Sequence, residues 1–273
     1  MLLTIILLAQ QLFLSTLYQS YPTVLIHGIT SNTKELLPLQ NYLTNELNID
    51  TYNIEIGNGV IDSISMNMNN QCDNFANSIA KLNITANKIN IIGISQGGLN
   101  ARCYVERYSY LSDYPDVNVL MTIGTPHAGF YNPLITIKKL EYWKDPLNYD
   151  KYLNTNDYLV DLNNERVNIN SSNTQKGIAK LAKFIMIWSN IDKVIKPLES
   201  AKFEFYDINI ANKTGELIIQ PFEKSEQYKN NLIGLKTLQE KKDLLIWQID
   251  CEHDKFKTPE CFIPILNKFI KFF

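Results

Sequence analysis

One serine of this chain lies in a sequence context that would make it a nucleophile. Ser95 is the central residue of Gly93-Ile94-Ser95-Gln96-Gly97. The apolar, β-branched residues 89–94 predict a buried strand, and the periodic apolar residues between 99 and 104 predict a helix directly after it. A Gly-x-Ser-x-Gly sequence between a strand and a helix is typical of a nucleophile elbow. The flanking elements therefore favour an elbow over an ordinary glycine-bearing turn.

A serine hydroxyl attacks at neutral pH only when a histidine takes its proton and an acid orients that histidine. In sheet-based hydrolases with such an elbow, the chain order is serine, acid, histidine. The chain has three histidines. His27 precedes Ser95, and His127 follows it by only one predicted strand. His253, beyond the last strong strand, is therefore the predicted base.

The acid should lie between Ser95 and His253, in a loop after a sheet strand. Asp192 fits best, because it follows the predicted strand at residues 184–188 by four positions. Asp207, after the strand-like residues 203–206, is the second candidate. A purely structural role for Asp192 is the alternative.

The tetrahedral intermediate of acyl transfer needs N–H donors for its oxyanion. The predicted strand at residues 22–26 runs into His27-Gly28, a sequence typical of a loop that supplies one such donor. We expect the donors to be the backbone N–H groups of Ile29 and Gln96, so the chemistry should not require their side chains. His27 is expected to be structural.

These residues need a sheet to position them, and the sequence predicts an α/β fold. Strands alternate with helices of ten or more residues, which indicates a mostly parallel sheet with helices on both faces. The strands are expected at residues 22–26, 50–56, 89–94, 118–123, 184–188 and 244–249, and the helices at 35–47, 66–82, after Ser95, and at 262–273.

The 273 residues, 45% of them hydrophobic, suffice for one large core. We expect one domain at residues 21–273, with a cap-like insertion at about 130–183 that lacks strong strands. Tyr142, Trp143 and Tyr149 would line an acyl groove there or pack the cap on the body. The net charge of −2 and the lack of a basic stripe argue against nucleic acid as a partner.

Residues 1–20 are apolar and resemble a signal peptide, although no Lys or Arg precedes Lys34. An N-terminal core helix or a membrane anchor is the alternative, and Gln10-Gln11 argues against a full span. Sequons at Asn83, Asn170 and Asn212 would accept glycans in the secretory pathway.

The four cysteines lack metal-ligand spacing, so we expect no metal. Cys72 and Cys103 fall on the predicted helices before and after the elbow strand, and Cys251 and Cys261 bracket the last loop. We predict Cys72–Cys103 and Cys251–Cys261 disulfides, with four buried thiols in a reduced protein as the alternative.

With these residues in view, the chain resembles the palmitoyl-protein thioesterase family, which are α/β-hydrolases of the lysosome. The resemblance runs nearly end to end after residue 20. Its most specific parts lie in the insertion, at Tyr142-Trp143-Lys144-Asp145-Pro146 and Asp161-Leu162-Asn163-Asn164-Glu165-Arg166. The chain departs at Ser31-Asn32, where some relatives have a cysteine pair, and at Ile29, where relatives often have another apolar residue.

The resemblance implies that Ser95 is the nucleophile, Asp192 the acid and His253 the base of a thioesterase without a cofactor. The implied substrates are S-palmitoylated proteins or peptides and other fatty acyl thioesters, cleaved by a lysosomal or secreted monomer that does not insert stably into membranes. Two other interpretations remain open. One is an oxygen-ester lipase, an esterase or an acyl-CoA thioesterase with the same triad, and the other is a non-catalytic fatty-acyl-binding protein.

Overall fold

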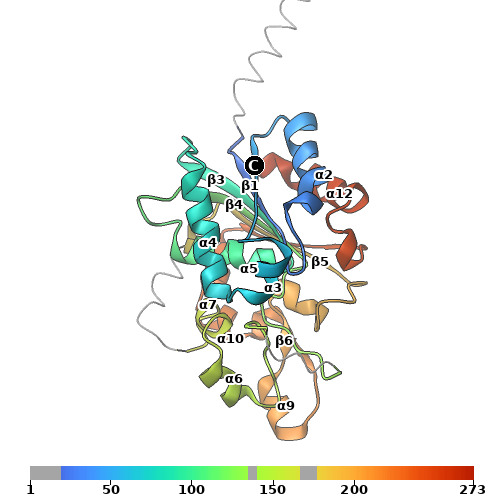
Figure 1. Cartoon of the computed structure of the whole chain (residues 1–273). Coiled ribbons are helices and arrows are strands. Elements are labelled where there is room, and N and C mark those ends of the chain that lie inside the picture. The colour runs from blue at the N-terminus through green and yellow to red at the C-terminus, as the bar shows by residue number, and fades with distance from the viewer. Residues whose placement is uncertain (1–19, 135–139, 167–176) are drawn as a thin grey trace, which may run out of the picture.

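A parallel β-sheet forms the centre of the computed structural model, which describes residues 20–134, 140–166 and 177–273 (Figure 1). The strand order is β2-β1-β3-β4-β5-β8, and every neighbouring pair is parallel. The strands are β1 Thr23–Ile26, β2 Thr51–Ile54, β3 Lys88–Ile94, β4 Asp116–Ile123, β5 Lys183–Ser189 and β8 Leu244–Ile249. The predicted α/β class and parallel sheet are confirmed. The predicted leader lies outside the described residues, except for Ser20.

Helices cover both faces of the sheet because the strands are apolar on both sides. In β1, Val24 belongs to the core cluster on one face and Leu25 to the cluster on the other. The first face is covered by α4 Met68–Lys81, α5 Gln96–Arg107 and α11 Leu235–Glu240. The second face is covered by η1 Thr33–Leu36, α2 Leu37–Asn41, the π-helical turn η2 Tyr42–Glu46 and α12 Pro259–Phe269, which is followed by η6 Ile270–Phe272.

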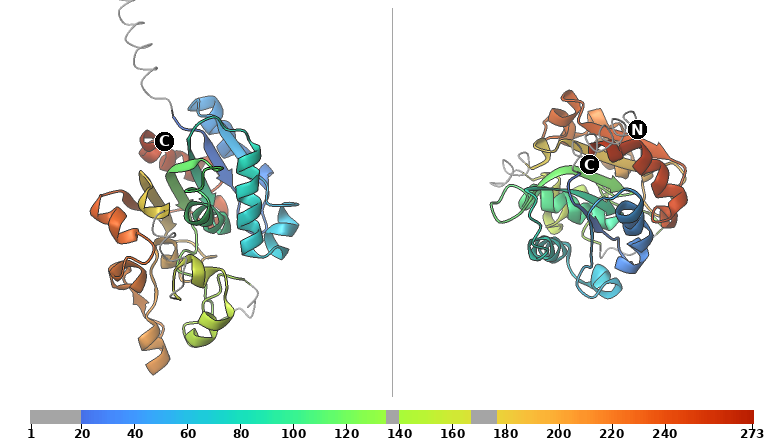
Figure 2. Two further views of the ribbon diagram at one scale, coloured as in Figure 1. Left: turned by 90° about the vertical axis from the view of Figure 1, so that its left-hand side faces the viewer. Right: turned by 90° about the horizontal axis from the view of Figure 1, so that it is seen from above.

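A cap lies beyond the carboxyl edge of the sheet, and two segments of the chain build it (Figures 1 and 2). The first is the predicted insertion, with α6 Tyr149–Thr155 and α7 Leu159–Leu162. The second was not assigned to the cap from sequence and contains β6 Phe205–Tyr206, α9 Ile208–Thr214, β7 Ile219–Gln220, η4 Phe222–Lys224 and α10 Glu226–Lys229. The two segments touch where Phe205 packs with Ala128 and Tyr131. Strands β6 and β7 pair only with each other, in antiparallel orientation.

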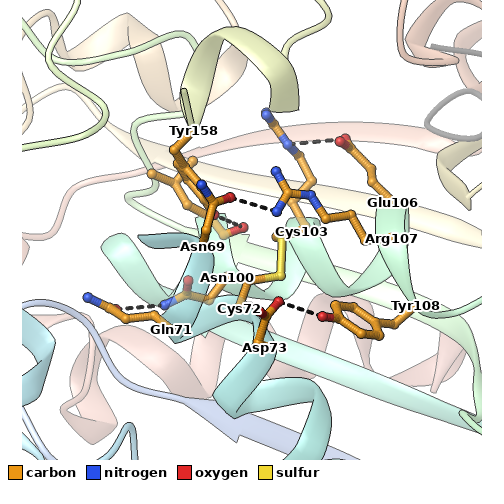
Figure 3. The surroundings of a disulfide bond; sticks show 12 residues. Asn69, Gln71, Cys72, Asp73, Asn100, Cys103, Glu106, Arg107, Tyr108 and Tyr158 are labelled. Carbon is orange, nitrogen blue, oxygen red and sulfur yellow. Dashed lines mark hydrogen bonds and ion pairs between the residues drawn. A yellow bond between two sulfur atoms is a disulfide. The ribbon is translucent and has the colours of Figure 1, made fainter. Parts of the chain in front are cut away.

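Two disulfide bonds cross-link elements in the body of the molecule. Cys72 of α4 is bonded to Cys103 of α5, which joins the helices on either side of the elbow strand (Figure 3). Cys251 is bonded to Cys261 of α12. Both predicted pairs are thus present, and the alternative of four free thiols is wrong. Within the three described ranges, no helix has the length and apolarity needed to cross a membrane.

Candidate active site

Ser95 lies at the sharp turn between β3 and α5. Its backbone angles are φ 56° and ψ −127°, a conformation that non-glycine residues rarely adopt and that is typical of functional sites. A Cβ atom on Gly97 would lie 2.4 Å from the carbonyl oxygen of His27, so only glycine lets the helix begin this close to β1. The predicted elbow is therefore present in backbone geometry.

The structure brings the three predicted side chains of the site together. Ser95 Oγ lies 3.0 Å from His253 Nε2, and His253 Nδ1 lies 2.8 Å from Asp192 Oδ2. Ser95 and Asp192 are buried, while the His253 side chain is 11% exposed. Each residue follows the carboxyl end of a sheet strand, namely β3, β5 and β8. The contacts are those that a nucleophile, base and acid require.

Asp192 is held as an acid that orients a histidine should be. Its Oδ1 accepts the N–H groups of Val194 at 2.8 Å and Ile195 at 3.0 Å, which leaves Oδ2 for His253. The second candidate, Asp207, instead caps α9 by accepting the N–H groups of Asn209 and Ile210. Asp207 therefore has a structural task away from His253.

The other two histidines have structural partners. His27 is buried, and its ring bonds to Gly28 O at 2.9 Å and lies 2.6 Å from a Glu55 carboxylate oxygen. His127 is also buried, stacks on Phe203 and lies 2.8 Å from Thr122 Oγ1. Burial lowers the pKa of His127 well below its usual value, with a further contribution from nearby Arg102. His127 is thus a neutral core residue at physiological pH.

The two expected oxyanion donors lie on segments that approach Ser95 from different sides. A Cβ atom on Gly28 would lie 2.9 Å from Ser95 Cβ, so the loop after β1 passes directly beside the nucleophile. In the part of the chain that the structure describes, the N–H of Ile29 has no hydrogen-bond acceptor. Gln96 is the first residue of α5, where helical N–H groups have no acceptor within the helix. Both N–H groups are therefore available to a ligand.

A small pocket of about 180 Å³ adjoins these donors. Ile29 and Gln96 line it together with Tyr142 from the cap. A larger pocket of about 450 Å³ is lined by cap residues, among them Trp143. Tyr149 stacks on Tyr152 and bonds to Glu165, so its observed contacts are packing contacts. Of the three aromatic residues considered for an acyl groove, only Tyr142 lies beside the oxyanion donors.

The loop that carries His253 is held at both ends. The Cys251–Cys261 bond ties its start to α12, and Phe256, which is fully buried, packs edge-on against the imidazole at 5.4 Å between ring centroids. The short η5 helix, His253–Lys255, begins at the histidine itself. These contacts fix the imidazole against Ser95.

The profile of a family described as palmitoyl protein thioesterase matches residues 22–253. The chain belongs to this family. Palmitoyl-protein thioesterase 3 of Dictyostelium discoideum is 34% identical over 254 residues, which cover 85% of this chain and 84% of that protein. A Drosophila melanogaster protein named lysosomal thioesterase PPT2 homolog is 28% identical and covers 82% of each chain.

The fold of this palmitoyl protein thioesterase family member is also found in solved structures of other proteins. A lipase-esterase related protein of Clostridium acetobutylicum superposes with a TM-score of 0.52 at 13% identity, covering 93% of this chain and 96% of that one. A carboxylesterase of Nitrososphaera gargenis has a TM-score of 0.52 at 15% identity, covering 93% and 90%. The expected α/β-hydrolase fold and the expected thioesterase family are thus confirmed.

The family motifs in the insertion prove to be structural contacts of the cap. Lys144 lies 2.9 Å from Glu165 in a buried ion pair, and Arg166 lies 3.0 Å from Asp161. Asn163 accepts a hydrogen bond of 2.6 Å from the buried Arg102 of α5, which ties the cap to the elbow helix. In the sequence, these residues indicated only a resemblance to the family, and their structural contacts could not be predicted.

Two sequons, at Asn83 and Asn212, are exposed, and the third, at Asn170, lies outside the described residues. Helix α3, Val60–Ser65, was not predicted from the sequence, and neither was its buried Ser63, which also lines the small pocket. The only signal for α3 is a short apolar stretch after Gly57-Asn58-Gly59.

Proposed function

We propose that the protein hydrolyses long-chain fatty acyl thioesters, in particular palmitoyl groups on cysteine residues of S-acylated proteins or peptides. The contact series Asp192–His253–Ser95, at 2.8 Å and 3.0 Å, carries this proposal. Family membership and the name of the Dictyostelium relative support the choice of a palmitoyl thioester.

In the first half of the proposed reaction, Ser95 Oγ attacks the acyl carbonyl carbon while His253 Nε2 takes the hydroxyl proton. Asp192 holds the imidazole in the required tautomer and stabilises its positive charge. The N–H groups of Ile29 and Gln96 bind the oxyanion. The intermediate collapses by releasing a cysteine thiolate, which is a good leaving group because a cysteine thiol has a pKa of about 8.5. His253 gives the proton that it took from Ser95 to this thiolate, so the imidazole is ready to act as a base again.

In the second half, His253 removes a proton from water, and the resulting nucleophile attacks the acyl-Ser95 ester. Collapse of the second intermediate returns the proton to Ser95 Oγ and releases the fatty acid. No metal or cofactor takes part in either step.

The same triad would serve an oxygen-ester lipase or esterase, so substrate comparison tests the proposal. The kcat/KM for a palmitoylated cysteine peptide is measured beside that for the matched palmitoyl serine peptide. We expect the thioester to be preferred, and a strong preference for the oxygen ester would contradict the proposal. A fluorophosphonate probe should label Ser95. Failure of Ser95 to react with the probe would favour the alternative of a non-catalytic acyl-binding protein.

We further propose a lysosomal location, which the name of the Drosophila relative supports. The exposed sequons at Asn83 and Asn212 are suited to glycosylation in the secretory pathway. Treatment of the secreted or lysosomal protein with an N-glycosidase should lower its apparent mass, and Asn83→Gln and Asn212→Gln should each reduce that change.

A further inference from the structure

A buried serine lies between the two segments that carry the proposed oxyanion donors. Ser63 of α3 is 2% exposed, although Ile61 and Ile64 beside it are 68% and 57% exposed. Burial of a hydroxyl is unfavourable unless it is hydrogen-bonded, so the contacts of Ser63 indicate why a short exposed helix directs this one side chain inward.

The hydroxyl of Ser63 holds the loop after β1. Its Oγ accepts the N–H of Thr30 at 2.9 Å and donates to Val60 O at 2.8 Å. Thr30 has a positive φ of 58° and directly follows Ile29. The hydrogen bond therefore fixes the peptide group next to the proposed donor N–H of Ile29.

The carbonyl of the same residue holds the other donor segment. Gln96 Nε2 donates to Ser63 O at 2.8 Å and to Gln71 Oε1 at 3.0 Å. At the opposite end of that amide, the Tyr142 hydroxyl of the cap donates to Gln96 Oε1 at 3.1 Å. Gln96 is 2% exposed, so its side chain is fixed by three hydrogen bonds inside the protein.

Gln71 anchors this network to α4. Its Nε2 donates to Met66 O at 2.8 Å, and its Oε1 also accepts from Asn100 Nδ2 at 3.1 Å. Figure 3 shows Gln71 and Asn100 directed toward each other from α4 and α5, beside the Cys72–Cys103 bond. The network thus rests on two helices that are covalently joined.

We propose that Ser63 is a positioning residue that sets the spacing of the two oxyanion donors, with the Gln96 side chain as its counterpart. This inference rests on the proposed function. Ser63 binds the Ile29 segment through Oγ and the Gln96 segment through its carbonyl, so one residue joins both. Donors stabilise an oxyanion only when they are preorganised around its position. The side chain of Gln96 therefore matters to the reaction, in contrast to the expectation from sequence.

The direct test is Ser63→Ala, which removes the acceptor of the Thr30 N–H and keeps the backbone carbonyl. A misplaced donor costs less than a deleted one, which typically costs about 10²–10³-fold in rate. We expect kcat for the palmitoyl thioester to fall roughly 10-fold to 100-fold, with KM nearly unchanged. Ser63→Thr retains the hydroxyl and should restore most of the rate.

A trifluoromethyl ketone with a long alkyl chain supplies a readout specific to the oxyanion. Ser95 Oγ adds to its carbonyl carbon, His253 takes the proton, and the ketone oxygen becomes the anion. Its inhibition constant should rise in Ser63→Ala by the same factor by which kcat/KM falls. Tyr142→Phe removes one bond to Gln96 without altering a backbone contact, and it should show the same proportionality with a smaller change.

Ser109→Ala is the matched control, because Ser109 is also a buried serine whose Oγ donates to a helical carbonyl, that of Val105. It should lose stability without changing kcat or ketone affinity. The inference is overturned if Ser63→Ala keeps the kcat and ketone affinity of the wild type. A wild type that neither cleaves the thioester nor reacts with a fluorophosphonate overturns the proposed function itself, and this inference with it.

Discussion

The carboxylate of Asp192 lies 2.8 Å from Nδ1 of His253, although 61 residues separate the two along the chain. The other carboxylate oxygen is occupied by the N–H groups of Val194 and Ile195. The aspartate thus has one oxygen for the backbone and one for the imidazole. Its position is fixed by the loop after β5, whereas that of the histidine is fixed by the loop after β8.

Asp192→Asn should therefore lower kcat by about 10⁴-fold, because an amide in this place favours the wrong imidazole tautomer. Asp207→Asn is the matched control. Asp207 caps α9, and asparagine caps helices about as well as aspartate, so activity and stability should remain close to those of the wild type. Steady-state hydrolysis of a palmitoyl thioester measures both. A benign Asp192→Asn together with an inactive Asp207→Asn would reverse the assignment of the acid.

Ser95→Ala should abolish turnover, with a loss of roughly 10⁴- to 10⁶-fold in kcat, since it removes the hydroxyl that lies 3.0 Å from His253 Nε2. Alanine fills the same space without its oxygen, so the midpoint of urea unfolding should change little. Fluorophosphonate labelling should disappear, while binding of a palmitoyl ligand should persist. Residual labelling at wild-type rate would show that another residue is the nucleophile.

The sheet could be predicted from sequence because buried parallel strands are nearly continuous apolar runs. Residues 89–94 and 184–188 lie within β3 and β5 of the structure. The meeting of Ser95, Asp192 and His253 could be anticipated as well, because residues after the carboxyl ends of parallel strands share one edge of a sheet. Their catalytic role stays a prediction.

Features that depend on tertiary contacts were not predictable. The strand-like residues 203–206 contain β6, but β6 and β7 have two residues each, which is too short for a pattern that would show where they pack. Their place in the cap was therefore not predicted. Helix α3 has six residues and exposes most of its apolar side chains. The proposed positioning role of Ser63 rests on its contacts with Thr30 and Gln96, each at a sequence separation of 33 residues, which no local pattern indicates.

The two disulfides should have different effects on activity. Removing the Cys251–Cys261 bond as Cys251→Ser/Cys261→Ser releases the loop that carries His253, so kcat should fall at a temperature where the protein is still folded. The closed loop spans 10 residues, and chain entropy predicts a loss of about 3 kcal/mol in the free energy of unfolding.

The Cys72→Ser/Cys103→Ser variant is the comparison. Its bond closes a loop of 31 residues, so about 4 kcal/mol of unfolding free energy should be lost, with little change in kcat. Urea unfolding and thioester hydrolysis are measured for both variants under the same conditions. Equal kcat values in the two would mean that the bond beside His253 does not position the imidazole.

Glu106 should make stability depend on pH. Its carboxyl is buried in α5, and neither oxygen has a hydrogen-bond partner among the described residues. Burial raises its pKa from 4.5 to about 8, even though Arg102 Nε lies 3.3 Å from one carboxyl oxygen. The ion pair lacks a hydrogen bond, so the desolvation of the carboxylate outweighs the attraction of the guanidinium.

Between pH 4.5 and about 8, Glu106 is therefore protonated in the folded protein and ionised in the unfolded chain. This contribution to stability is fully present below pH 4.5 and is lost as pH rises through that window. Glu106→Gln mimics the protonated carboxyl and should flatten the dependence by up to about 1.4 kcal/mol per pH unit. Urea unfolding at several pH values in this window measures the slope.

Glu226→Gln, on an exposed helix surface, should leave the slope as in the wild type. Identical slopes for the wild type and Glu106→Gln would show that Glu106 is ionised in the folded protein.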